Sequence, residues 1–135
     1  MNACDYSSYA LPTINFIAGE TQDLVFNVYF YRNKEVFNLD GCACSFSISN
    51  FMNQTGEPIL VKNTNVNPDE VIMSNNRLMI TLSSSDTIEL SGKYVYQIVI
   101  LDEITNAIEI PKQGILYIKN NIDKQTIQNW TKSKS

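Results

Sequence analysis

The sequence has no histidine, and its ten basic residues include only two arginines, Arg32 and Arg77. Imidazole is the commonest general base in enzymes and the commonest transition-metal ligand. Its absence excludes general-base catalysis by histidine and metal binding by histidine. Fourteen acidic residues give a net charge of −4. Nucleic-acid-binding domains are usually basic, and anionic membranes attract clusters of lysine and arginine. We therefore expect neither nucleic acid nor a membrane as a partner.

Cysteine and glycine are scarce as well. The three cysteines are Cys4, Cys42 and Cys44, and an odd number does not suggest a disulfide framework. Cys42 and Cys44 stand two apart in an expected strand, which puts both side chains on one face. We expect both to be small buried apolar residues. A metal site would need further ligands, and Cys4 is a poor candidate for a third ligand. The five glycines are scattered and form no phosphate-binding loop. We expect no metal and no cofactor.

Long apolar runs are missing too. No stretch approaches the roughly 18 apolar residues that a transmembrane helix requires. The N-terminal sequence MNACDYSSYALPTINF lacks the basic and apolar regions of a secretory signal. We expect a protein that is made and folded in a cytosol and is not exported by a signal peptide.

What the sequence does contain is strict alternation of apolar and polar residues. In Gly92–Asp102 the side chains of Tyr94, Tyr96, Ile98 and Ile100 share one face, which predicts a half-buried β-strand with both tyrosines in the core. Similar short strands are expected at Thr13–Ala18, Asp23–Tyr31, Cys42–Ser49, Ile59–Lys62, Val71–Met73, Leu78–Leu82, Ile108–Ile110 and Gly114–Lys119. Many short strands at regular spacing in 135 residues predict one antiparallel β-sandwich.

Two local features interrupt this pattern. Residues Ser83–Leu90 form the one expected helical turn, with a serine available as N-cap and Asp86 near the positive end of its dipole. Pro111 cannot donate a ladder hydrogen bond, so it is expected at an edge or at the end of a strand.

Carboxylates occur in pairs at Asp69–Glu70 and Asp102–Glu103, and Asp86 lies close to Glu89. Paired carboxylates can catalyse glycoside hydrolysis, and turn carboxylates can bind calcium. Their positions in predicted turns and loops instead favour solvated surface charge. We expect no catalytic residues and no enzymatic activity.

Tyrosines suggest a different binding site. Tyr29 and Tyr31 share a strand face with Asn27, so partial exposure is expected there. Exposed aromatic rings can stack on sugars. Tyr29 and Tyr31 are therefore the candidate platform for a glycan.

The two terminal segments, 1–12 and 120–135, lie outside the predicted sandwich of residues 13–119. They are expected to be extended arms, yet they are richer in large apolar residues than disordered tails are. Their candidate partner-binding residues are Tyr6, Tyr9, Leu11, Ile122, Ile127 and Trp130. Ile127 and Trp130 have the spacing of helical neighbours. Two alternatives stay open: the arms dock on a neighbouring subunit, or they fold back over their own sandwich.

Several motifs recur in a familiar order along the chain. They are Gly19-Glu20-Thr21, Leu39-Asp40-Gly41, the segment Ile80–Thr87, Gly92–Ile98, Ile110-Pro111 and Gly114–Ile118. In this order residues 14–119 resemble the immunoglobulin-like N-terminal domain of phage baseplate upper proteins and related small virion proteins of Firmicutes phages.

The resemblance implies an immunoglobulin-like β-sandwich that serves as a non-enzymatic assembly module in a tailed-phage virion. Its partners would be tail, baseplate or capsid proteins, or further copies of itself. In baseplate upper proteins a long helical or fibre region follows the module, whereas this chain ends at Ser135. A small accessory part on the tail or baseplate, or decorating the capsid, is the better expectation. The alternative is a carbohydrate-binding module that recognises a cell-surface glycan.

Overall fold

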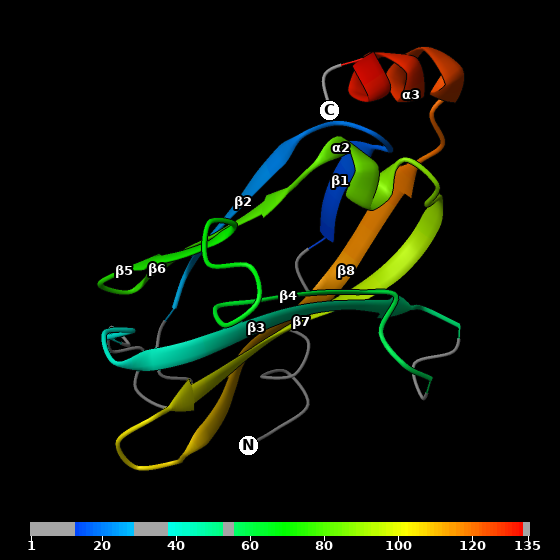
Figure 1. Cartoon of the computed structure of the whole chain (residues 1–135). Coiled ribbons are helices and arrows are strands. Elements are labelled where there is room, and N and C mark those ends of the chain that lie inside the picture. The colour runs from blue at the N-terminus through cyan, green and yellow to red at the C-terminus, as the bar shows by residue number, and fades with distance from the viewer. Residues whose placement is uncertain (1–12, 29–37, 53–55, 134–135) are drawn as a thin grey trace.

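The computed structural model describes residues 13–28, 38–52 and 56–133 as two packed β-sheets with a helix across one end (Figure 1). The first sheet has five strands in the order β1 (Thr13–Ile17), β8 (Ile108–Lys119), β7 (Gly92–Asp102), β3 (Cys42–Asn50) and β4 (Leu60–Asn63). The second has three strands in the order β2 (Gln22–Asn27), β6 (Arg77–Leu82) and β5 (Val71–Ser74). The helices are α2 (Ser84–Thr87) and α3 (Lys124–Ser133).

The order of the strands identifies the fold. All described pairings are antiparallel except β1 with β8, which is parallel. The neighbours β8-β7-β3 and β2-β6-β5 have the order of strands G-F-C and B-E-D in immunoglobulin domains. The predicted immunoglobulin-like sandwich is confirmed, with a parallel edge strand that the sequence pattern did not indicate.

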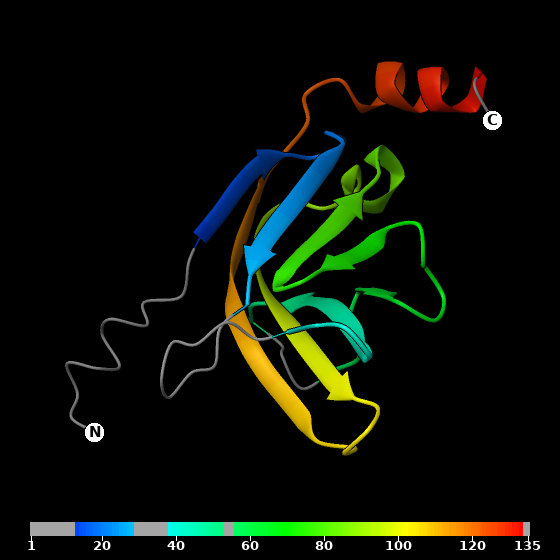
Figure 2. The same ribbon diagram turned by 90° about the vertical axis from the view of Figure 1, so that its left-hand side faces the viewer.

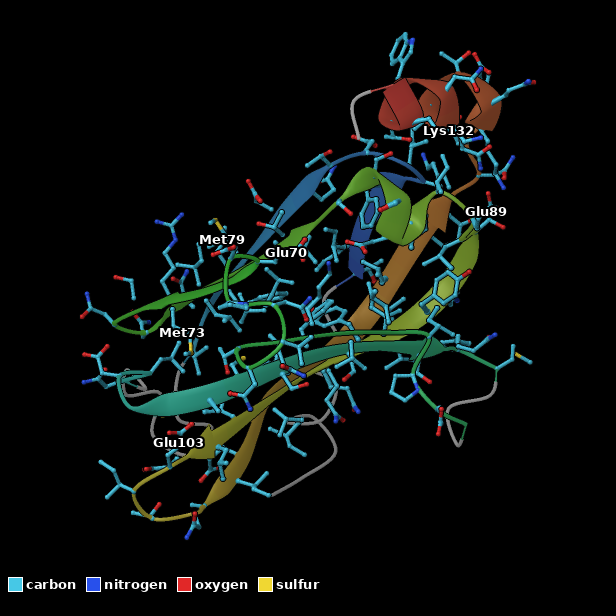
Figure 3. The ribbon with its side chains drawn as sticks, in the orientation of Figure 1. Glu70, Met73, Met79, Glu89, Glu103 and Lys132 are labelled. Atoms are coloured by element: carbon cyan, nitrogen blue, oxygen red, sulfur yellow. The ribbon has the colours of Figure 1, made fainter. Side chains whose placement is uncertain are left out.

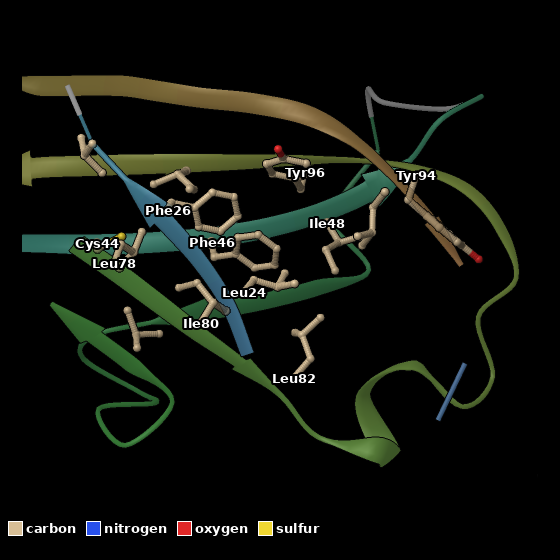
Figure 4. Packing of buried hydrophobic residues seen from close by; sticks show 14 of the residues in the cluster. Leu24, Phe26, Cys44, Phe46, Ile48, Leu78, Ile80, Leu82, Tyr94 and Tyr96 are labelled. Atoms are coloured by element: carbon tan, nitrogen blue, oxygen red, sulfur yellow. The ribbon is translucent and has the colours of Figure 1, made fainter. Parts of the chain in front are cut away.

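Three aromatic rings occupy the centre of the core (Figure 4). Phe26 of β2, Phe46 of β3 and Tyr96 of β7 have ring centroids 5.6 to 6.3 Å apart. In antibody domains this place holds a disulfide between strands B and F packed against a tryptophan of strand C. Here aromatic contacts join the same three strands, and each such pair is worth about 0.5–1.5 kcal/mol beyond its burial.

Tyr94 has a different role from Tyr96, although both lie on the core side as predicted, 9% and 1% exposed. The Tyr94 hydroxyl donates to the carbonyl oxygen of Ser91 and accepts from the Ser91 N–H, both at 3.0 Å. It stands two residues before Tyr96, as the corner tyrosine of immunoglobulin domains stands two residues before their second cysteine. Tyr94 therefore fixes the turn that leads into β7.

The two tyrosines should respond oppositely to loss of their hydroxyl groups. The Tyr96 hydroxyl is buried and has no hydrogen-bond partner in the described part of the chain. Tyr94→Phe should lower the free energy of unfolding by about 1 kcal/mol, whereas Tyr96→Phe should raise it by a similar amount. Urea denaturation of both variants measures this. Equal losses in both would show that the Tyr96 hydroxyl does have a partner.

β8 is longer than predicted. The sequence pattern predicted two segments, Ile108–Ile110 and Gly114–Lys119, whereas the structure has one strand through Pro111. Ile98 pairs with Lys112 and Ile100 with Glu109, so β8 contains one extra residue at this point. Such a β-bulge interrupts the ladder and accommodates a residue without an N–H group.

A second helix corrects the expectation of a single helical turn. α3 begins after Asp123, whose carboxylate accepts from the Thr126 N–H at 3.3 Å and from the Thr126 hydroxyl at 2.7 Å. This is an N-cap. A ten-residue helix is marginal in water, so α3 depends on contacts with the sandwich that the local sequence does not reveal.

Candidate interaction surfaces

The hairpin between β7 and β8 projects from the end of the sandwich opposite α3 (Figures 1 and 2). We call residues 102–110 the hairpin tip. Ile104, Ile108 and Ile110 are 85%, 65% and 55% exposed there. The turn is well defined, because the Asp102 carboxylate accepts from the Ile104 N–H at 2.9 Å and Asn106 adopts a left-handed conformation with φ of 61°. The isoleucines are thus held on an ordered turn.

Acidic side chains accompany these isoleucines. Asp102, Glu103 and Glu109 belong to the hairpin tip itself. Burial is the main cause that raises the pKa of Cys42, and the charges of Asp102, Glu103 and Asp40 add to it. These carboxylates therefore gather at the same end of the molecule, and the tip is both apolar and negative.

The other end of the sandwich also exposes large apolar residues. We call residues 119–132 the α3 end. Ile122 is 98% exposed and Trp130 is 63% exposed. The segment carries Lys119, Lys124 and Lys132 and a single acid, Asp123, which caps the helix. Glu89 accepts from Gln128 of α3, and Glu20 follows Gly19, which faces Ile127, so three carboxylates accompany the three lysines and this end is apolar and mixed in charge.

α3 is nevertheless attached to its own sandwich. The Asn121 side-chain amide donates to the Ala18 carbonyl at 2.8 Å, and that of Gln128 donates to the Glu89 carboxylate at 2.7 Å. Ile127 is partly buried and faces Gly19. The helix is therefore a fixed part of the fold, with its position set by residues from distant parts of the chain.

The predicted site residues separate into three groups. Ile127 packs on its own sandwich, which is the fold-back alternative. Ile122 and Trp130 are exposed, so their docking on a partner stays a prediction. The others lie outside the described residues: Tyr6, Tyr9, Leu11, Tyr29 and Tyr31.

Sequence reasoning missed a buried charged cluster. Lys62 of β4 is 5% exposed, and its ammonium lies 2.9 Å from Glu70 Oε1 and 2.9 Å from Asp86 Oδ2. Glu70 and Asp86 are thus ion-paired rather than solvated as expected. Burial acts to lower the pKa of Lys62, but the hydrogen bonds and charges of Asp86 and Glu70 outweigh it and raise the pKa above 10.5.

This cluster has a structural role. It joins β4 of the five-stranded sheet to the residue before β5 and to α2, so it ties the two sheets together. Asp86 also accepts from the Ser83 N–H at 2.7 Å, which caps α2. The only hint in the sequence was that Leu60 and Lys62 share one face of a predicted strand.

The thiols of Cys42 and Cys44 are free, and both lie against the core as predicted. Burial is the main cause that raises the pKa of Cys44 from 9.0 to about 12, and the neighbouring Cys42 adds to it. Nucleophilic cysteines have lowered pKa values. These two residues therefore serve packing.

Cys44 should resist alkylation in the folded protein. A thiol with a pKa of about 12 is thiolate to roughly one part in ten thousand at pH 8. We expect iodoacetamide to leave Cys44 unmodified until urea unfolds the chain, while the partly exposed Cys42 reacts slowly. Above pH 9 the unfolded chain releases the Cys44 proton that the folded chain keeps, so stability should fall as the pH rises from 9 towards 12. Peptide mass spectrometry measures the labelling, and equal rates with and without urea would contradict it.

Within residues 13–28, 38–52 and 56–133, no group of three or more acidic or cysteine residues is arranged to hold a metal ion. No helix in the described chain is long and apolar enough to cross a membrane. No protein-family model matches the sequence, and a search of curated proteins finds no match.

Proposed function

We propose that this protein is a non-enzymatic structural component of a tailed-bacteriophage particle, an immunoglobulin-like module on the tail or baseplate or on the capsid. The observation that carries the proposal is the exposure of large apolar side chains at both ends of a rigid sandwich, above all Ile104, Ile122 and Trp130. Clustered exposed apolar residues mark protein-interaction sites. The resemblance of residues 14–119 to phage baseplate modules supplies the biological context.

The sandwich would act as a spacer that presents these two ends at a fixed separation. Burying an isoleucine side chain contributes about 1.5–3 kcal/mol, so each end by itself supports only weak binding. Repeated copies on one particle raise the effective concentration of each binding surface around its partner. Attachment therefore becomes stronger although no single contact changes.

Purified particles of the phage that encodes the chain test this proposal. Peptide mass spectrometry should detect the protein in density-gradient-purified particles at a fixed ratio to the major structural proteins. Immunogold electron microscopy should place it on the head, tail or baseplate. Abundance in the infected-cell lysate together with absence from the particles would contradict a virion role.

Glycan binding is the alternative function. Asn27, which shares its predicted face with Tyr29 and Tyr31, is exposed on β2. A glycan array with the isolated protein and with a Tyr29→Ala/Tyr31→Ala variant separates the two functions. Specific binding that the variant loses would favour the carbohydrate-binding module.

A further inference from the structure

We infer that Pro111, together with the β-bulge around it, prevents a second copy of this protein from adding a strand to the free edge of β8, residues 108–114. The inference goes beyond the proposed function, because it concerns the protein in solution and holds whether or not the chain belongs to a phage particle. It follows from the length of the free edge, from the side chains exposed along it and from the backbone at Pro111.

β8 has a neighbouring strand along only part of its outer side. β7 pairs with β8 on one side along nearly its whole length, whereas β1 on the other side pairs only with Ile115–Lys119. Within the part of the chain that the structure describes, residues 108–114 therefore have no partner strand on that side. Figure 2 shows β1 beside the part of β8 that is nearer to α3, and Figure 3 places Glu103 at the opposite end, far from Lys132 of α3.

The free edge is long enough to accept a further strand. At a rise of about 3.4 Å per residue, residues 108–114 span about 24 Å. By comparison, β1 has five residues, and β4 at the opposite edge of the same sheet has four. Unpaired N–H and C=O groups on an edge strand are a template for pairing with another chain. The free edge of β8 is therefore long enough to need protection.

The side chains along the free edge favour such pairing. Ile108 and Ile110 are 65% and 55% exposed, and Glu109 between them is exposed as well. β-branched residues have high β-propensity, and a long exposed apolar edge strand is a site of aggregation. One carboxylate is a small obstacle in comparison. The side chains by themselves therefore leave this edge open to a second copy.

The backbone at Pro111 opposes pairing. Proline has no N–H group, so it cannot donate a hydrogen bond to an added strand. The ladder with β7 is irregular here, because Ile98 pairs with Lys112 and Ile100 with Glu109, which leaves one extra residue in β8. A bulge bends its strand and increases the twist, and natural sheets protect their edges with both prolines and bulges. A straight incoming strand therefore loses its register at Pro111.

The opposite edge of the sheet is protected in a different way. β4 is short, and its Lys62 lies on the core side opposite Phe46, where it is 5% exposed and paired with Glu70 and Asp86. An inward-pointing charge on an edge strand opposes strand addition. With both edges protected, the protein can expose the isoleucines of the hairpin tip without edge-to-edge polymerisation.

Two substitutions of Pro111 in the full chain test the inference. Pro111→Val restores the N–H group and favours a strand, so the free edges of two copies should pair symmetrically and the mass should double. Pro111→Lys restores the same N–H group but adds a charge to the edge, so it should sediment like the wild type. Analytical ultracentrifugation up to about 1 mM detects dissociation constants up to that value.

Hydrogen exchange read by peptide mass spectrometry locates the contact. The Pro111→Val protein should gain protection in residues 108–114 at high concentration, and the wild type and Pro111→Lys should not. Pro68→Val, at an exposed proline in the turn before β5, is the control for loss of a proline and should behave like the wild type. Urea denaturation compares the stability of all variants, and Pro111→Thr takes the place of Pro111→Val if the valine variant does not fold.

Three outcomes would overturn the inference. The first is a Pro111→Val protein that sediments like the wild type at about 1 mM. The second is equal association of Pro111→Lys, because loss of the proline ring rather than an open edge would then be the cause. The third is new protection in β5 in place of residues 108–114. Detection of the protein in particles is a separate measurement, so either proposal can fail while the other stands.

Discussion

Lys62→Ala is expected to lower the free energy of unfolding by about 3 kcal/mol. Removing the ammonium leaves the Glu70 and Asp86 carboxylates without the cation that neutralises them inside the sandwich. Breaking a buried ion pair on one side costs about 3–5 kcal/mol, and the partial exposure of these carboxylates, 30% and 15%, places the loss at the lower end. Urea denaturation monitored by tyrosine fluorescence or circular dichroism measures it.

Lys119→Ala, at an exposed lysine, is the control and should change stability by less than about 0.5 kcal/mol. The variant Lys62→Met/Glu70→Gln/Asp86→Asn should recover much of the loss, because it removes all three charges together. The pKa of Lys62 is raised, so its contribution should be complete below pH 10.5 and lost as the pH rises through the folded pKa. If Lys62→Ala is no more harmful than Lys119→Ala, the cluster does not hold the sheets together.

Gly114→Ala should destabilise the protein by about 3 kcal/mol, the upper part of the range for overpacking a core. Gly114 of β8 is paired with Tyr96 of β7, and an added methyl group would lie 2.6 Å from Cε2 of the tyrosine ring. The ring cannot shift freely, because it is buried and packs against both Phe26 and Phe46. Thermal and urea unfolding both report the loss.

Tyr96→Leu provides the internal check. In the Tyr96→Leu background the ring is gone, so Gly114→Ala should then cost less than about 1 kcal/mol, and the double-mutant cycle should show strong coupling. Gln113→Ala, at the exposed neighbouring residue, should be close to neutral. A Gly114→Ala protein as stable as the wild type would mean that the Tyr96 ring has room to move.

Most strands were predictable, because their information is local. Cys44, Phe46 and Ile48 alternate with small polar residues, and β3 buries those three side chains as expected. The same period placed Tyr94 and Tyr96 in the core. Alternation along a strand reflects burial of one face, so it can be read without knowing which strand lies alongside.

The errors arose where contacts between distant residues outweighed local preference. The sequence pattern divided β8 at Pro111, yet pairing with β7 carries the strand through it as a bulge; Pro111 lies at an edge as expected, because β1 pairs only with Ile115–Lys119 among the described residues. The tail was expected to be an extended arm, and the helical spacing of Ile127 and Trp130 was its one helix signal; α3 is held by bonds to Ala18 and Glu89. Carboxylates in turns are usually solvated, but Glu70 and Asp86 converge on one lysine.

Local alternation and turn residues therefore sufficed for the sandwich class and for the core faces of its strands. The pairing of strands, the buried charge cluster and the exposed apolar ends required the folded chain. Hydrophobic periodicity depends on residues that are neighbours in sequence. The role of a charge or of an exposed apolar side chain depends on which distant residues folding places beside it. The carboxylates of the hairpin tip and the lysines of the α3 end look alike in sequence as ordinary surface charge. Only the folded chain, in which β7 and β8 run between the two ends, places them at opposite poles of the sandwich (Figure 1).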